Sequence, residues 1–172
     1  AYRLYSGINE KLWRRLEQGE IAKKDLVVLR FVHLLESLNR SGDAVAISEA
    51  YRLYLGEGAF LLPGAEELCR SLASVCRLII ASNGVTSIQK SRLARSAIAP
   101  YIEKLIVSES GGADKPDLRF FTYLDQEVGP LDKSTTLMVG DRLEADILGG
   151  FRFGVDTCWY NPHGKELSGE VT

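Results

Sequence analysis

The sequence has few of the features that are typical of secreted, zinc-binding or membrane-spanning proteins. Its 172 residues include three cysteines and one methionine. Cys69, Cys76 and Cys158 are odd in number and form no Cys-x-x-Cys pair, which argues against a disulfide framework or a zinc site. No stretch approaches the roughly 20 apolar residues of a membrane-spanning helix. Since no basic stretch followed by an apolar run stands at the N-terminus, we expect no signal peptide and a reducing, cytoplasmic location.

The chain also lacks an excess of charge of one sign. Lys and Arg total 21 and Asp and Glu total 23, so the formal net charge is -2. Without a strong positive field, we expect neither a nucleic-acid polymer nor a membrane surface as partner. Hydrophobic residues make up 45% and charged residues 26%, which excludes a disordered chain and is typical of a protein with a sizeable core.

The first part of the chain, residues 1–62, has only helical periodicity. Ile8, Leu12 and Leu16 repeat at four-residue spacing, and Gly19 follows them as a helix-ending glycine would. Similar apolar stripes cover residues 26–38 and 45–55. The sequence therefore predicts three short amphipathic helices with no strand between them.

After Pro63, short apolar runs alternate with helical segments. The runs cover residues 78–81, 105–107, 137–139 and 157–160, and the helical segments cover residues 65–74, 87–96, 118–128 and 145–148. This alternation is typical of an α/β fold with a parallel sheet buried on both faces. In such sheets, functional residues follow the carboxyl ends of the strands.

Polar residues stand where ligand sites of such a sheet are expected. Ser82-Asn83-Gly84, Lys115-Pro116 and Gly140-Asp141 follow the first three apolar runs. Together they offer a hydroxyl with backbone N–H groups, a cation and a carboxylate, a set that suits a phosphate with a divalent metal ion.

Each of these residues also has a purely structural explanation when it is taken alone. Ser82-Asn83-Gly84 fits a turn with a helix N-cap, and Lys115 fits a solvated lysine before a turn proline. Asp141 fits a helix N-cap and Asp146 an acid in the first helical turn. Their placement after successive strands favours one shared site.

These motifs resemble those of the haloacid dehalogenase (HAD) superfamily. Ser82-Asn83-Gly84 resembles its second motif, and Ser108-Glu109 with Lys115-Pro116-Asp117 resembles its third-motif region. Gly140-Asp141 with Asp146 resembles the acidic GDxxxxD motif. Residues 146–162, 8–13 and 17–21 are more similar to the branch of bacterial pyrimidine 5'-nucleotidases, so the resemblance covers nearly the whole chain.

The resemblance implies a helical cap in residues 1–62 and a Rossmann-like HAD core in residues 63–172. It implies Mg²⁺ and hydrolysis of a small phosphate ester, here a nucleoside monophosphate, through an aspartyl-phosphate. Carried over, Ser82 and the amide of Asn83 hold the phosphoryl group, and Lys115 neutralises charge on it. Asp141 binds Mg²⁺, and Asp146 supports the metal site through water or by orienting Lys115.

The chain departs from the family pattern in two places. Arg142 replaces a small polar residue, and no Asp-x-Asp occurs anywhere, although the family's nucleophile motif DxDxT should precede the cap. Because Ala1 already lies in cap-like sequence, we expect the chain to be part of a longer protein and to be inactive alone. The missing strand is expected in the centre of the sheet, between the strands that end at Ser82 and Asp141.

Three rival functions remain open at this stage. Within the superfamily, they are a 2-haloacid dehalogenase and a phosphatase for a small sugar or glycolate phosphate. Dehalogenases need no metal, so the intact pair of Asp141 and Asp146 favours a phosphatase. The third rival, from another class, is a non-catalytic binding protein that has lost its nucleophile.

Other candidates carry weaker signals. We expect His33 to be packed, His163 to be exposed, and Cys158 to lie inert in a buried strand. Four residues of the helical segment either line a nucleobase pocket or form the core of the cap, and the second interpretation is favoured: Trp13, Arg30, Tyr51 and Tyr54.

Overall fold

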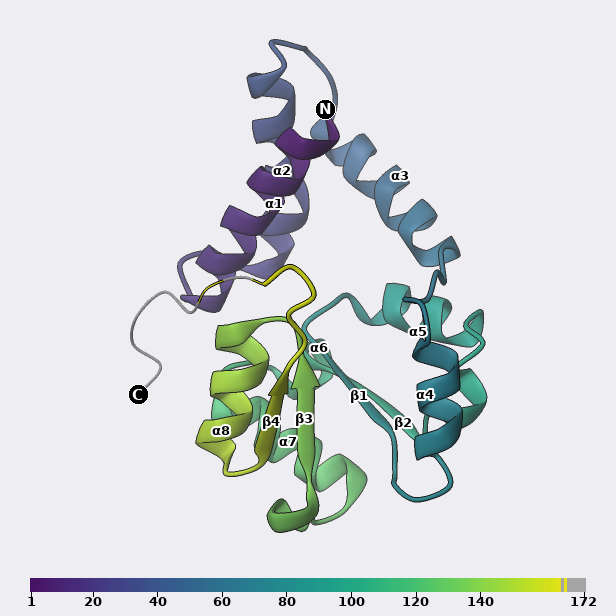
Figure 1. The fold of residues 1–172 in the computed structure, drawn as a ribbon. Coiled ribbons are helices and arrows are strands. Elements are labelled where there is room, and N and C mark those ends of the chain that lie inside the picture. The colour runs from purple at the N-terminus through teal and green to yellow at the C-terminus, as the bar shows by residue number, and fades with distance from the viewer. Residues whose placement is uncertain (165, 167–172) are drawn as a thin grey trace. The chain divides into compact units, whose positions relative to one another are not determined.

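The computed structural model describes residues 1–164 and residue 166, and these form two compact units (Figure 1). The first unit contains residues 1–63 and 87–99, and the second contains residues 64–86 and the described residues from Pro100 on. The division into a cap and a core at residue 62 stays a prediction. No helix in the described part of the chain is long and apolar enough to cross a membrane.

The first unit is built from helices, as its periodicity predicts. They are α1 (Tyr2–Glu17), α2 (Lys23–Ser37) and α3 (Ala44–Glu57), with most of α5 (Thr86–Ala94). Gly19 follows α1 with a φ of 74°, in the left-handed region that glycine adopts without strain. Asp43 caps α3 by accepting hydrogen bonds from the amides of Val45 (2.9 Å) and Ala46 (3.1 Å).

The interior of this unit holds a cation among aromatic rings. Arg30 is 6% exposed, and its guanidinium lies 4.7 Å from the ring centroid of Tyr51 and 5.2 Å from that of Phe31. Burial raises the pKa of Tyr5, whose ring is stacked on Phe31. Arg30 and Tyr51 therefore belong to the core of the helical unit, in agreement with the favoured interpretation, whereas Tyr54 is exposed.

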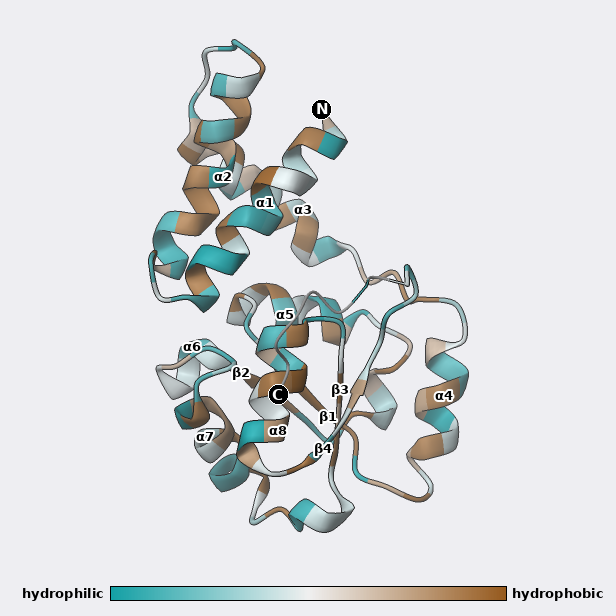
Figure 2. Ribbon diagram, turned by 60° about the vertical axis from the view of Figure 1, so that its left-hand side comes forward, coloured by the Kyte–Doolittle hydropathy of each residue, from teal (hydrophilic) through white to brown (hydrophobic). Residues whose placement is uncertain are grey.

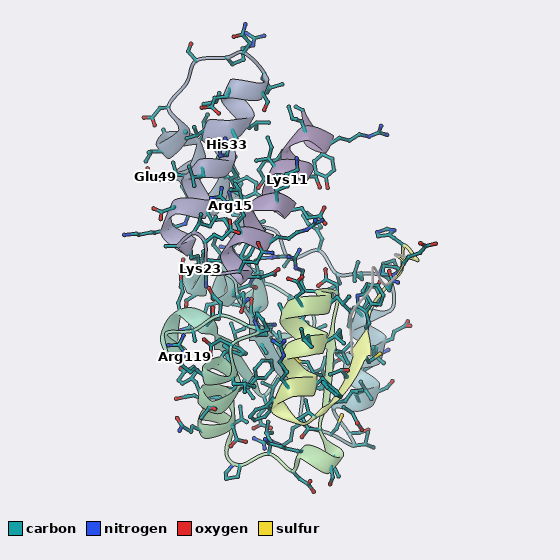
Figure 3. All side chains as sticks on the ribbon, turned by 90° about the vertical axis from the view of Figure 1, so that its left-hand side faces the viewer. Lys11, Arg15, Lys23, His33, Glu49 and Arg119 are labelled. Carbon is teal, nitrogen blue, oxygen red and sulfur yellow. The ribbon has the colours of Figure 1, made fainter. Side chains whose placement is uncertain are left out.

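His33 differs from its expected packing. Figure 3 shows it on α2, where its side chain is partly exposed and its Nδ1 atom lies 3.2 Å from Glu36 Oε2. A histidine one turn from a carboxylate on a helix surface can keep its polar ring in water, which the apolar neighbours in the sequence do not reveal.

The second unit is the α/β part of the molecule. Its strands are β1 (Ile79–Ser82), β2 (Lys104–Val107), β3 (Leu137–Gly140) and β4 (Asp156–Trp159). Its helices are α4 (Ala65–Leu72), α6 (Ser108–Gly111), α7 (Leu118–Val128), the π-helix η3 (Leu143–Leu148) and α8 (Gly149–Phe153). Two short 3₁₀ turns, η1 (Ala99–Tyr101) and η2 (Lys133–Thr135), complete the elements of the described residues. The predicted α/β fold class is confirmed.

The strands pair in parallel, as two separate two-stranded sheets. β1 pairs with β2, and β3 pairs with β4, whereas β1 and β3 are not hydrogen-bonded to each other in the described chain. The expectation that the strands ending at Ser82 and before Asp141 are not direct neighbours is therefore confirmed. A further strand between them remains a prediction.

The core of the second unit lies between β2 and α7. Ile106 packs there with Phe120, Phe121, Leu124 and Val128, all of them buried. Figure 2 shows the hydrophobic character of β1 and β2, which supply the sheet side of this core.

The expectation that both faces of the sheet are buried is wrong for the second strand pair. Leu137 and Val139 alternate along β3 and are each 57% exposed, and Cys158 on β4 is exposed rather than buried. Gly150 of α8 covers the opposite face, since a Cβ there would lie 3.1 Å from the Cβ of Met138. The apolar run of β3 correctly indicated a strand, but only packing decides how many of its faces are covered.

Candidate active site

The candidate site lies at the carboxyl ends of β1 and β3, and all its predicted residues belong to the second unit. Ser82 is the last residue of β1, and Asp141 directly follows the last residue of β3. Asp146 stands in η3, and Lys115 in the segment between α6 and α7. Of these side chains, the structure brings Lys115 and Asp146 into contact, while Ser82 and Asp141 stand at the carboxyl ends of β1 and β3, where ligand sites of parallel sheets lie.

Ser82 is oriented by the turn that follows it. Its Oγ accepts a hydrogen bond from the amide of Gly84 at 3.0 Å. Because the hydroxyl oxygen is an acceptor in this turn, its proton can be donated to a ligand. The amide of Thr86, further along the turn, donates to Glu109 Oε2 at 2.7 Å.

The ammonium group of Lys115 links β1 to η3, the helix that follows β3. Its Nζ donates to the carbonyl oxygen of Ala81 in β1 at 2.6 Å and to Asp146 Oδ1 at 2.7 Å. The side chains of Lys115 and Asp146 are only 7% and 8% exposed. Two of the three N–H groups of the amine are thus engaged, and no hydrogen-bond acceptor for the third is found among residues 1–164 and 166.

Asp146 is held from both sides. Its Oδ2 accepts from the amide of Arg142 at 3.1 Å, while Oδ1 binds Lys115. The π-helix begins at this point, because the carbonyl oxygen of Arg142 accepts from the amides of Asp146 (2.8 Å) and Ile147 (3.3 Å). The predicted helix over residues 145–148 is therefore a π-turn that continues into α8, and its geometry turns Asp146 towards Lys115.

Because Gly140 has no side chain, the carboxylate of Asp146 can lie directly against its backbone. A Cβ at Gly140 would lie 2.2 Å from Asp146 Oδ2, closer than two such atoms can approach. The glycine of the Gly140-Asp141 pair is thus required by the acid six residues later, a reason that the sequence alone does not show.

Asp141 is placed differently from Asp146. It is exposed, and its backbone carbonyl accepts from Trp159 Nε1 at 3.2 Å. No hydrogen bond or ion pair to its carboxylate is found among residues 1–164 and 166. A free carboxylate at a strand end is a suitable ligand for a hard cation such as Mg²⁺, which prefers oxygen.

The fit to a metal ion is partial in this chain. The described residues contain no group of three or more His, Cys, Asp or Glu side chains placed to hold an ion. Asp141 could supply one oxygen directly, while both oxygens of Asp146 already accept hydrogen bonds. Of the two roles expected for Asp146, its contacts favour the orientation of Lys115.

Asn83 has a role that the sequence did not indicate. Its side chain contacts the backbone of Lys115, 32 residues away, through two hydrogen bonds of 2.8 Å. An Asn between Ser82 and Gly84 is the ordinary composition of a turn, so no local signal reveals this contact. The expected contact of the Asn83 amide with a phosphoryl group stays a prediction.

The residues after Lys115 serve the fold. Asp117 caps α7 by accepting from the amide of Arg119 at 2.8 Å, and hydrogen bonds from Arg119 hold the pKa of this carboxyl below its usual range. Phe120 and Phe121 are buried in the core. The peptide bond between Lys115 and Pro116 is cis.

Known proteins resemble this chain over most of its length. A family model described as haloacid dehalogenase-like hydrolase matches residues 3–154. The pyrimidine 5'-nucleotidase PynA of Streptococcus pneumoniae is 39% identical over 163 residues, which are 94% of this chain and 69% of that protein. The pyrimidine 5'-nucleotidase YjjG of Escherichia coli is 35% identical over 94% of this chain and 71% of its own length.

A solved structure is similar as well. The crystal structure of the HAD-hydrolase YfnB of Bacillus subtilis, bound to magnesium, superposes with a TM-score of 0.89. It is 37% identical and aligns with 94% of this chain and 72% of that chain. The family match, these relatives and the fold agree with the motifs at the strand ends, and the chain belongs to the haloacid dehalogenase-like hydrolase family.

Proposed function

We propose that the protein is a Mg²⁺-dependent phosphatase that hydrolyses nucleoside 5'-monophosphates. The observation that carries this proposal is the position of Lys115, whose amine donates to Ala81 of β1 and to Asp146 of η3 and has no third hydrogen-bond partner among the described residues. A buried cation held next to the end of β1, where Ser82 stands, suits the binding of a phosphoryl group.

In this proposal, each site residue has a role that follows from its charge or its hydrogen-bonding groups. Ser82 donates its proton to a phosphoryl oxygen, because the Gly84 amide already donates to its oxygen. Lys115 offsets negative charge with its remaining N–H, and Asp146 holds the amine in place. Asp141 is the residue of this chain that would bind Mg²⁺, and the ion would supply further positive charge beside the phosphate.

The nucleophile is proposed to lie outside this chain. The resemblance to the family implies an aspartate whose carboxylate attacks phosphorus as the ester oxygen leaves. Water then hydrolyses the resulting aspartyl-phosphate and releases inorganic phosphate. Asp146 is unsuited to this role, because both of its oxygens accept hydrogen bonds from the protein.

The proposed substrate class comes from the relatives. PynA and YjjG are pyrimidine 5'-nucleotidases by name, and they align with 94% of this chain. The net charge of -2 supports a small phosphate ester, rather than a nucleic-acid polymer or a membrane, as the partner. A cytoplasmic location remains a prediction.

The test is a substrate panel for the protein expressed from its complete reading frame. Phosphate release would be measured with uridine, thymidine and adenosine 5'-monophosphates and with glycolate and sugar phosphates, and halide release with 2-chloropropionate. We expect the highest kcat/KM for the pyrimidine nucleotides, with loss of activity when EDTA removes Mg²⁺. Halide release without metal would instead establish a dehalogenase, and a preference for glycolate or sugar phosphates would overturn the nucleotidase proposal.

A further inference from the structure

The backbone of Lys115 is fastened to the turn after β1 by one side chain. Asn83 Nδ2 donates to the carbonyl oxygen of Lys115, and Asn83 Oδ1 accepts from the Lys115 amide, both at 2.8 Å. The amine of the same residue donates to Ala81, two residues before Asn83. Lys115 is thus held to the end of β1 at both its backbone and its side-chain end.

The chemistry of this contact requires an amide. A carboxamide offers a donor and an acceptor side by side, and here each faces the complementary group of one backbone residue. The orientation of the carboxamide follows from these partners, since the reversed one would set donor against donor and acceptor against acceptor. An aspartate has the same size, but in its ionised form it would bring an oxygen against the Lys115 carbonyl.

The two hydrogen bonds from Asn83 matter because the remaining N–H of the Lys115 amine must point at a charge that develops during the reaction. A misplacement of about 1 Å at such a group can cost roughly a hundredfold in rate. Asn83 directly follows Ser82, so the same short turn fixes the serine hydroxyl and the lysine relative to each other.

We propose that the side chain of Asn83 is a positioning residue that sets the place of the Lys115 amine in the site. This inference rests on the proposed phosphatase function and adds to it a role for a side chain that contacts no reacting atom. It predicts that Asn83 acts through Lys115, and that its removal weakens catalysis more than substrate binding.

The kinetic test uses Asn83→Ala and Asn83→Asp in the protein from the complete reading frame. Asn83→Ala is expected to lower kcat by roughly 10- to 100-fold, with a much smaller change in KM. Asn83→Asp should show a kcat, relative to the parent, that rises as the pH is lowered. A protonated carboxyl can again donate to the Lys115 carbonyl and accept from its amide.

The matched control is Arg77→Ala in the same unit. Arg77 donates to the carbonyl oxygen of Val128 and pairs with Glu103, so its removal destabilises this unit without touching Lys115. Arg77→Ala is expected to keep the parent kcat below its melting temperature. An equal loss of kcat in both alanine variants would mean general destabilisation and would overturn the proposal.

A second readout does not depend on turnover. Hydrogen exchange of the Lys115 amide reports directly on its hydrogen bond to Asn83, and the NMR signal of the Lys115 ammonium reports on the position of the amine. Under conditions far from unfolding, where local opening governs exchange, we expect exchange at least about tenfold faster in Asn83→Ala and unchanged in Arg77→Ala. Unchanged exchange, or faster exchange with a normal kcat, would overturn the positioning role.

The failure of this inference can be told apart from the failure of the proposed function. If no phosphate ester is hydrolysed, the proposed function fails, and the exchange rate and NMR signal of Lys115 still decide whether Asn83 positions Lys115. Should Asn83→Ala not fold, the pH dependence of Asn83→Asp provides the same test.

Discussion

The two acids of the GDxxxxD motif have opposite environments. Asp146 is buried against a lysine and a backbone amide, whereas Asp141 is exposed with a carboxylate that has no partner in the described chain. Burial of a charge is costly unless it is paired, so Asp146 has a structural requirement that Asp141 lacks. Substitutions at the two positions should therefore have different effects on stability.

Asp141→Asn should remove activity and leave the fold intact. The proposed metal ion loses its anionic ligand, so we expect a loss of kcat of at least about a hundredfold, comparable to the loss of a charge-stabilising group. The melting temperature should stay within a few degrees, because the carboxylate stabilises nothing in the described structure. Kinetics with graded Mg²⁺ and a thermal melt would measure both, with Ser82→Ala as the milder comparison. Near-normal turnover with a lowered melting temperature would instead identify Asp141 as a helix cap.

Lys115→Met should destabilise the protein as well as inactivate it. It leaves the Asp146 carboxylate buried without its cation, a change that typically costs about 3–5 kcal/mol. The double variant Lys115→Met/Asp146→Leu removes both charges and should recover part of this loss. Urea unfolding of the two single variants and the double variant gives the coupling free energy. If the losses simply add, the ion pair is energetically independent and this account of the site is wrong.

Among the helices, α7 depends on a charged cap. Arg119 holds the pKa of Asp117 below its usual range, so the folded state favours the ionised carboxyl. The stabilisation is therefore complete above the unfolded pKa of about 3.9 and is lost as the pH falls through the lower folded pKa. Asp117→Asn should lower stability by about 0.2–1 kcal/mol at neutral pH, the range for exposed ion pairs.

The pH dependence separates the charge of this cap from its hydrogen bonds. Melting temperatures of the parent and the Asp117→Asn variant should converge as the pH is lowered below about 4. In an Arg119→Ala background, the effect of Asp117→Asn on the melting temperature should shrink at neutral pH. A constant effect at every pH would show that the carboxylate charge plays no part.

The sequence predicted the elements better than their surroundings. The strands lie within one residue of the apolar runs, and α7 covers the predicted residues 118–128, since glycine, serine and proline bound these segments. The helix α8 was missed, and the π-turn before it was predicted as an ordinary helix. The π-turn depends on one carbonyl, that of Arg142, accepting two amides, which no propensity encodes.

For the candidate site, the sequence indicated the residue types and, as one of two alternatives, the contact between Asp146 and Lys115. Ser82 ends β1 and Asp141 directly follows β3, as their order along the chain indicated, and Lys115 contacts Asp146. The roles of these residues in one shared site stay a prediction. The other partners of Lys115 could not be foreseen, because Ala81 and Asn83 are more than 30 residues away and contact it only in the folded sheet. Likewise, the reason for a glycine at position 140 is found only in the structure, because a Cβ there would collide with Asp146.

At the scale of the whole molecule, the α/β unit has two separate strand pairs, and Lys115 links β1 of one pair to the helix η3 that follows β3 of the other. β1 and β3 each have one hydrogen-bonded neighbour in the described chain, so each keeps an open edge. Open edges and exposed apolar residues together favour association with other chains. The two exposed residues of β3, Leu137 and Val139, should therefore govern how the 172-residue protein behaves in solution.

The last prediction concerns the double variant Leu137→Thr/Val139→Thr. In the 172-residue protein, it should reduce self-association, measured by sedimentation or light scattering over a range of concentrations, because each side chain is 57% exposed. In a protein that has a further strand and its covering segments between β1 and β3, the same residues would be buried. There the substitutions should cost about 1–3 kcal/mol each, since a hydroxyl would enter an apolar site. If the substitutions are neutral in the longer protein as well, Leu137 and Val139 stay exposed to water there, and the proposed covering of this face is wrong.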